Sequence, residues 1–158
     1  MARPVPEYTV ADLEYLNAVE FPSLTNDEAV ALGLVAVEVI REWDLSLAVD
    51  IVIGDDLVFR AKLKSTGAGN DPWLKGKAAT ATTFGEPSLL VKTRHLESNT
   101  PFEDDDTLKF HGGSIPLRVG GQIVGTLTMS GEPDRTDHEA AAEAIERYLG
   151  VTDGKHEA

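Results

Sequence analysis

The sequence predicts a single α+β domain of three layers (α/β/α), with helices on both faces of an antiparallel sheet. Residues 47–63 and 115–129 alternate apolar and polar side chains with the period of two that is typical of strands, and each stretch contains a short turn. Strands joined by short turns pair antiparallel. Helical patterns occur before, between and after the two hairpins, which favours helices on both faces of the sheet.

The length of 158 residues fits one domain, which we expect to span residues 8–150. Residues 1–7 contain two prolines and little apolar content, and residues 151–158 are polar. We therefore expect both terminal segments to be flexible.

The domain begins with apolar side chains at helical spacing over residues 9–20, which predicts a short helix ending before Pro22. A second helix is predicted from Thr25 to about Trp43, because Thr25 and Glu28 form the pattern of a capping box. Its apolar face is broad, which indicates burial against the sheet and against another helix or subunit.

The first hairpin turns at Gly54–Asp56. Simple alternation places four apolar side chains on one face of its second strand: Leu57, Phe59, Ala61 and Leu63. The same alternation places Val58 on the opposite face with Arg60 and Lys62.

Three further helices are predicted, over about residues 72–83, 88–97 and 136–149. The first begins at Asp71–Pro72, since aspartate caps a helix and proline fits its first turn. The last begins with a capping box formed by Thr136 and Glu139. Between them, the acidic run 103–106 is most simply a solvated loop, because it lacks the ligand spacing of a calcium site.

The second hairpin turns at Gly120–Gly121, a pair that tolerates the positive φ angles of a tight turn. Pro116 has no N–H to donate, so we expect it in an edge strand or at the start of a strand. Gly125 predicts a bulge or a closely packed neighbour in the second strand.

Composition excludes several classes of function. The chain has no cysteine, so disulfides and thiolate chemistry are excluded. A net charge of −13 argues against nucleic acid and anionic membranes as partners. The first residues lack the apolar core of a secretory signal, and no apolar run approaches the length of about 20 residues that spans a bilayer. We expect a cytoplasmic protein.

Two histidines are candidates for metal binding or proton transfer. His111 directly precedes Gly112–Gly113 at the mouth of a strand, and His138 lies in the first turn of the last predicted helix. A structural role is the more frequent one for such residues. The chain contains no HExxH zinc motif, dinucleotide-binding GxGxxG motif, phosphate-binding P-loop or GxSxG nucleophile motif.

A cluster of basic residues stands out in this acidic chain. It consists of Arg60, Lys62, Lys64, Lys75 and Lys77, with Asp71 as the one acidic residue between them. Trp73 lies within the cluster and offers a flat apolar surface. The local field would attract a small anion, whereas the simpler interpretation is ordinary surface lysines.

Residues 111–119, HGGSIPLRV, and 121–131, GQIVGTLTMSG, followed by Asp137 at the start of a helix, resemble the signature of the haem-degrading domain family that includes HbpS, GlcG and the C-terminal domain of PduO. Residues 72–77, PWLKGK, are similar to an uncharacterised subgroup of that family. The resemblance covers about residues 25–150.

This resemblance implies a five-stranded antiparallel sheet between helices, with a profilin- or PAS-like shape, and a homo-oligomer. It also implies haem binding, with haem degradation in some members. On this resemblance, His111 and His138 are the candidate iron ligands. Arg60, Lys75 and Lys77 would meet the haem propionates, and Trp73, Gly112 and Gly113 would complete the ligand site.

Three hypotheses follow from the sequence. The first is a haem-binding protein with at most weak degrading activity. The second is an oligomeric scaffold or partner-binding module without chemistry. The third is a binder or enzyme for a small anionic metabolite at the basic cluster and the glycine turn.

Overall fold

A computed structural model describes residues 7–150 of the chain. Its helices are α1 (Val10–Leu13), α2 (Asn26–Glu42), α3 (Asp71–Phe84), α4 (Ser88–Glu97) and α5 (Asp134–Leu149), with 3-10 turns at Glu14–Ala18 and Ala68–Asn70. Its strands are β1 (Ala48–Ile53), β2 (Asp56–Lys62), β3 (Ser114–Val119) and β4 (Gln122–Ser130). The expected flexible segments lie, except for Glu7, outside the described residues.

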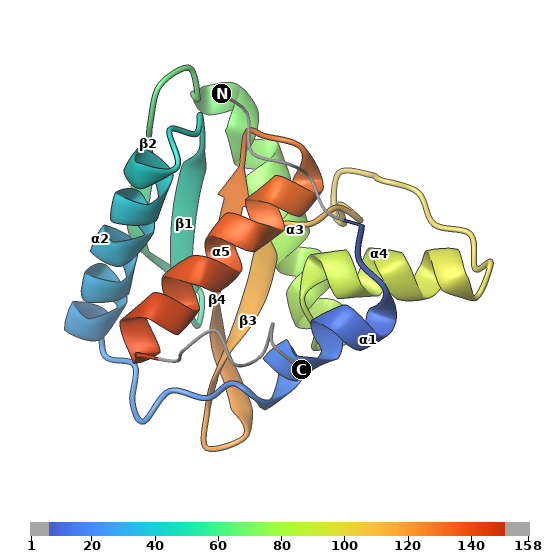
Figure 1. Cartoon of the computed structure of the whole chain (residues 1–158), viewed down its shortest axis with the longest axis horizontal. Coiled ribbons are helices and arrows are strands. Elements are labelled where there is room, and N and C mark those ends of the chain that lie inside the picture. Colours follow the sequence, from blue (N-terminus) through green and yellow to red (C-terminus); the bar gives the residue numbers. More distant parts are fainter. Residues whose placement is uncertain (1–6, 151–158) are drawn as a thin grey trace.

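The α+β class and the antiparallel pairing are confirmed. The strands lie in the order β2-β1-β4-β3, so the two predicted hairpins join side by side through β1 and β4 (Figure 1). β3 is an edge strand, one of the two placements expected from Pro116. The hairpin turn at Gly120 and Gly121 has the expected positive φ angles of 59° and 79°.

The expected fifth strand is wrong, because the sheet has four strands within residues 7–150. Beside β3, Phe21 makes one isolated parallel bridge to Val119, and its N–H donates to the Arg118 carbonyl at 2.8 Å. Pro22 follows immediately and has no N–H to continue a ladder. The bridge therefore does not extend into a strand.

The two faces of the sheet differ in polarity. Side chains such as Ile51, Leu127 and Met129 are fully buried in the main core with residues of α2 and α5. The alternating residues on the opposite face include Asp50 and Thr128, which are also buried. Figure 1 shows α2 and α5 in front of the sheet and α3 behind it. Thus α3 covers a polar face.

The first capping box is confirmed, since Thr25 and Glu28 reciprocally bond each other's backbone N–H at the start of α2. The second is wrong, because α5 begins at Asp134 after Pro133 and the predicted box lies inside the helix. Likewise, Asp71 is the first residue of α3 rather than its cap, and its carboxylate pairs with Lys62 instead.

The predicted assignment of side chains to the two faces of β2 is wrong at the start of the strand. Ile51 pairs with Phe59 but Val52 pairs with Leu57, so Val58 is the extra residue of a β-bulge. Val58 consequently packs against the main core, while Leu57 lies 49% exposed beside the face under α3. No helix among the described residues is long and apolar enough to cross a membrane.

Candidate functional site

A groove of about 800 Å³ lies between α3 and the sheet, and we call it the α3 groove. β1, β2 and β4 form its floor, with Val52, Leu57 and Ile123 as apolar contributors. Ala78 and Ala79 of α3 form its wall. These small side chains leave space where larger ones would fill the gap between helix and sheet.

Two of the four charged residues that line the α3 groove, Asp50 and Arg60, pair with each other. Arg60 donates two hydrogen bonds of 2.7 Å to the buried carboxylate of Asp50, its neighbour across the strands. Asp71 lies 3.6 Å from the same guanidinium. Lys75, in contrast, is exposed and has no ion pair within residues 7–150. Lys75 is thus a cation of this groove that is not held by a carboxylate, and Asp55 contributes an exposed carboxylate to the same lining.

A second cavity of about 500 Å³ lies beside His111, and we call it the His111 pocket. Trp73 and Lys77 reach it from α3, Lys92 reaches it from α4, and Asp134 from α5. The Trp73 and His111 rings meet edge-on with centroids 5.7 Å apart. The lining is predominantly charged and polar, unlike that of the α3 groove.

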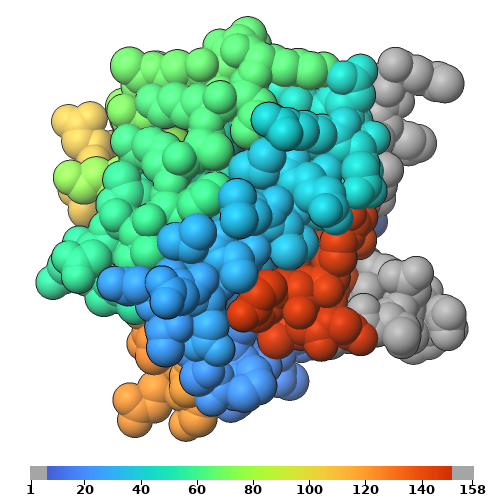
Figure 2. Space-filling model, turned by 90° about the vertical axis from the view of Figure 1, so that its left-hand side faces the viewer, coloured from blue at the N-terminus to red at the C-terminus, as the bar shows by residue number. Residues whose placement is uncertain are grey.

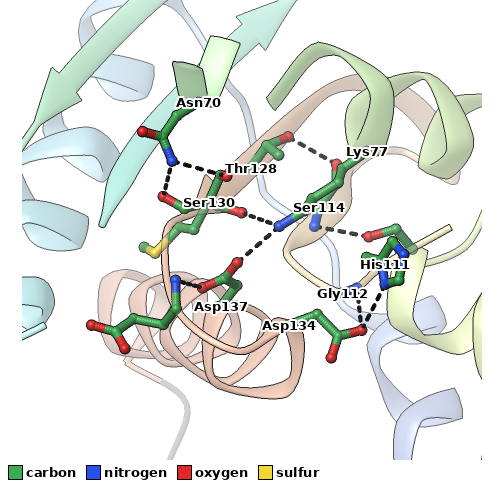
Figure 3. Close-up of polar contacts among 12 residues, drawn as sticks. Asn70, Lys77, His111, Gly112, Ser114, Thr128, Ser130, Asp134 and Asp137 are labelled. Atoms are coloured by element: carbon green, nitrogen blue, oxygen red, sulfur yellow. Dashed lines mark hydrogen bonds and ion pairs between the residues drawn. The ribbon is translucent and has the colours of Figure 1, made fainter. Parts of the chain in front are cut away.

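A buried ion pair forms one side of the His111 pocket (Figure 3). Lys77 Nζ donates to Asp137 Oδ2 at 2.8 Å and to the Met129 carbonyl at 3.0 Å. The Glu132 amide donates to the other oxygen of Asp137. Burial raises the pKa of Asp137 to about 6, although Lys77 opposes the shift. Lys77 is therefore committed to the protein's own carboxylate.

The His111 ring is held between two carboxylates. Its Nε2 lies 2.7 Å from Asp104 Oδ2, and its Nδ1 lies 3.6 Å from Asp134 Oδ2 and 3.2 Å from Lys92 Nζ. The nearby carboxylate of Asp134 is the largest cause that raises the pKa of His111, while burial and Lys92 oppose it. Both ring nitrogens of His111 therefore already have polar partners within the protein.

Asp134 anchors this arrangement. It accepts hydrogen bonds from Lys92 Nζ at 2.9 Å and from the Gly112 amide at 3.1 Å. Burial alone would raise the pKa of Asp134, but the hydrogen bonds from His111, Lys92 and Gly112 outweigh it and hold the pKa well below its usual range. Gly112 therefore acts here through its backbone amide.

His138, the other predicted iron ligand, is 2% exposed and lies edge-on against the ring of Tyr8. Burial lowers the pKa of His138 to about 4. Its ring is covered by the protein itself. The described residues contain no cluster of three or more histidine, cysteine, aspartate or glutamate side chains that would hold a metal ion.

Five of the sequence-predicted site residues divide between these two cavities, and Gly112, Gly113 and His138 line neither of them. Trp73, Lys77 and His111 line the His111 pocket, whereas Arg60 and Lys75 line the α3 groove. Residues two apart on a helix point about 200° away from each other, so Lys75 and Lys77 leave opposite sides of α3.

Sequence reasoning missed the partners of these residues. Asp50 could have been found from the sequence, because it is a single carboxylate in an otherwise apolar strand. Asp104 belongs to the acidic run that predicts a solvated loop, but its half-buried carboxylate accepts hydrogen bonds from His111 and from the Phe110 amide. Nothing in the sequence pattern brings Lys92 and Asp134 to His111.

Comparison with known proteins identifies the family. The family model described as haem degrading protein HbpS-like matches residues 24–146, and the chain belongs to this family. A UPF0303 protein of Streptomyces coelicolor is 38% identical over 149 residues, which cover 90% of this chain and 94% of the relative. The resemblance stated from the sequence is confirmed.

Three solved structures share the fold. The crystal structure of the Ybr137w protein has a TM-score of 0.78 with 23% identity, covering 94% of this chain and 90% of that chain. The structure of HbpS has a TM-score of 0.67 with 22% identity, over 84% of this chain and 94% of that one. A PduOC–haem complex has a TM-score of 0.60 with 20% identity, over 85% and 96%.

Proposed function

We propose that this chain binds haem and that the α3 groove is the binding site. The observation that carries the proposal is a groove of about 800 Å³ whose lining combines apolar side chains with polar ones and with the cation of Lys75, which has no ion pair within residues 7–150. Pockets of about 300–1,000 Å³ with mostly apolar walls and a few polar groups are typical binding sites for small molecules and cofactors. Membership of the HbpS-like family and the haem complex of a structural relative support the proposal.

The residues of the α3 groove fit the organic part of haem, a flat apolar ring that carries two carboxylates. Val52, Leu57 and Ile123 would contact the ring, since burial of apolar area is favourable at about 25 cal/mol per Å². Lys75 would neutralise one of the carboxylates, whereas Arg60 is already paired with Asp50. Bound haem would supply redox-active iron, while the chain itself holds the ring and excludes water from one side of it.

Two finer features belong to the same proposal. One is haem degradation, which the description of the family includes. It would appear as loss of the haem absorption band and release of iron when reductant and air are added to the complex. The other is assembly into a homo-oligomer. Haem that stays bound and intact after reductant and air are added would instead make the chain a haem carrier.

Titration of the full chain with haem tests the proposal. We expect a shifted Soret band that saturates at one haem per chain. Ala79→Trp should abolish the shift, because the indole would fill the α3 groove from its wall. Lys75→Glu should weaken binding by about tenfold or more, since a charge-assisted contact is worth roughly 1.5–3 kcal/mol.

Lys64→Glu is the matched control, because Lys64 is an exposed lysine that pairs with Asp44 outside the α3 groove. It should leave haem affinity unchanged. Haem binding that survives Ala79→Trp would exclude the α3 groove as the site. The absence of any Soret shift would leave the scaffold hypothesis, which expects assembly without a small ligand.

The small-anion hypothesis loses one of its two main cations. It relies on Lys75 and Lys77 acting together, and these residues line different cavities. Lys77 is 3% exposed and is paired with Asp137. An anion would have to displace a buried carboxylate to reach it.

A further inference from the structure

The residues that line the α3 groove include no side chain of the kinds that ligate haem iron. Haem iron is held in proteins by histidine, cysteine, methionine or tyrosine. The chain has no cysteine. Within residues 7–150, Met129 is fully buried in the main core and Tyr148 packs against that core. The hydroxyls of Tyr8 and Tyr15 donate to glutamates of α5.

The three described histidines are also committed elsewhere. His111 lies between Asp104 and Asp134 in the other cavity. His138 is buried against Tyr8. The ring of His95 packs among phenylalanines, and its Nδ1 lies 2.8 Å from the Val91 carbonyl. None of these rings lines the α3 groove.

What the α3 groove does offer is independent of iron. The apolar side chains of its floor (Val52, Leu57 and Ile123) and the alanine wall of α3 would contact a flat ring whether or not a metal occupies the ring centre. Lys75 would meet a peripheral carboxylate, a group that haem shares with its metal-free precursor. Contact area and charge neutralisation are therefore the sources of affinity that these residues provide.

We propose that the α3 groove recognises the tetrapyrrole frame and its carboxylates rather than the iron, so that metal-free porphyrin is a ligand of the same site. This inference rests on the proposed haem function and specifies which part of the ligand the groove recognises. The ligand class becomes carboxylate-bearing tetrapyrroles in general. Iron would then remain open to added ligands on at least one face of the bound ring.

The test compares haem with protoporphyrin IX on the full chain. Haem binding is followed by its Soret band and protoporphyrin binding by its fluorescence. We expect the two dissociation constants to agree within about threefold, a difference well under 1.4 kcal/mol. Ala79→Trp and Lys75→Glu should weaken both ligands in parallel, and the two ligands should compete.

His111→Ala provides the matched control for iron ligation. It should change neither dissociation constant and should leave the Soret maximum of the haem complex in place. Loss of haem affinity or a displaced Soret maximum in this variant would overturn the inference. Haem binding with protoporphyrin at least about tenfold weaker would also overturn it, although haem binding itself would stand. If neither ligand binds, the proposed function fails as well.

Discussion

His138 is a titratable side chain placed where it cannot be charged at low cost. It lies 2% exposed in α5, and its Nδ1 has no hydrogen-bond partner in the described part of the chain. The ring packs edge-on against Tyr8 at 5.7 Å. Desolvation of the imidazolium lowers the pKa of His138 to about 4, which makes the folding stability depend on pH through this residue.

We predict that His138 destabilises the fold as the solution is acidified. The unfolded chain binds this proton with a pKa of about 6.5, and the folded chain binds it only near 4. Between these values the unfolded state holds more protons, so stability falls as pH falls. The loss should reach on the order of 2–4 kcal/mol by pH 4. Urea unfolding at pH 7 and at pH 5 measures it.

His138→Leu should reduce this pH dependence, because leucine cannot take up a proton. The comparison between variant and wild type isolates His138 from Asp137, whose raised pKa acts in the opposite direction over part of the range. His95→Gln is the matched control, since it removes a histidine from α4 instead. An unchanged pH slope in His138→Leu would show that His138 is not the group responsible.

Residue identity alone indicated candidate site residues, but it did not indicate which of them would lie in the same cavity. Lys75 and Lys77 are neighbours in sequence, yet helical geometry sends them to separate cavities. Trp73 and Lys77 are four apart and do share a cavity. The angular spacing was available from the sequence. The pairing of Lys77 with Asp137, 60 residues away, depended on the tertiary fold.

At the scale of elements, glycines set how closely the ends of β3 and β4 approach α3 and α5. Gly113 has φ of 137°, and a Cβ there would lie 2.3 Å from the Met129 carbonyl and 3.0 Å from Lys77 Nζ. A Cβ at Gly112 would lie 2.5 Å from the Asp134 carbonyl. These glycines allow Lys77 of α3 to reach Asp137 of α5 beside the strand ends.

Gly113→Ala should therefore destabilise the protein by at least about 2 kcal/mol, because the positive φ and the contact with Met129 both oppose a side chain. Thermal or urea unfolding measures the effect. Gly67→Ala is the control, since a methyl group at this position would have no neighbour within 4 Å in the described part of the chain and the φ of Gly67 is extended. It should be near neutral. Equal stability of both variants would contradict this account of the glycine turn.

The elements that were predicted well are those whose signals are local. The capping box at Thr25 and the Gly120–Gly121 turn depend on a few adjacent residues. The bulge at Val58 was missed because alternation within one strand does not reveal how the partner strand pairs. The fifth strand was expected from the family resemblance. Pro22 has no N–H to extend the single bridge between Phe21 and Val119 into a strand.

Across the whole molecule, the sheet separates two kinds of interior. The face toward α2 and α5 is a conventional apolar core. The face toward α3 carries Asp50, Thr126 and Thr128, which are buried, and it borders the α3 groove. Buried polar groups are costly unless they are satisfied. The concentration of these buried polar side chains under α3 distinguishes the groove side of the sheet from the side that forms the apolar core.

The outer surface of α2 carries the remaining large-scale feature. Figure 2 views the molecule from this side, with α2 across the face beside α5. Leu34 is 60% exposed and Val30 is 37% exposed, one helical turn apart on α2. The sequence pattern predicted burial of α2 against the sheet and against another helix or subunit, and β1, β2 and α5 provide this burial. Val30 and Leu34 lie outside these contacts.

We predict that the outer face of α2 contacts a second copy of the chain, because burying this apolar stripe would be favourable. Light scattering on the wild-type protein should give a multiple of the single-chain mass, and Leu34→Glu should reduce it. Leu96→Glu is the matched control, since Leu96 is 57% exposed but lies on α4. If Leu34→Glu leaves the assembly intact while Leu96→Glu dissolves it, the interface lies at α4 instead. A wild-type protein with the mass of one chain would mean that the exposed stripe of α2 serves no self-association.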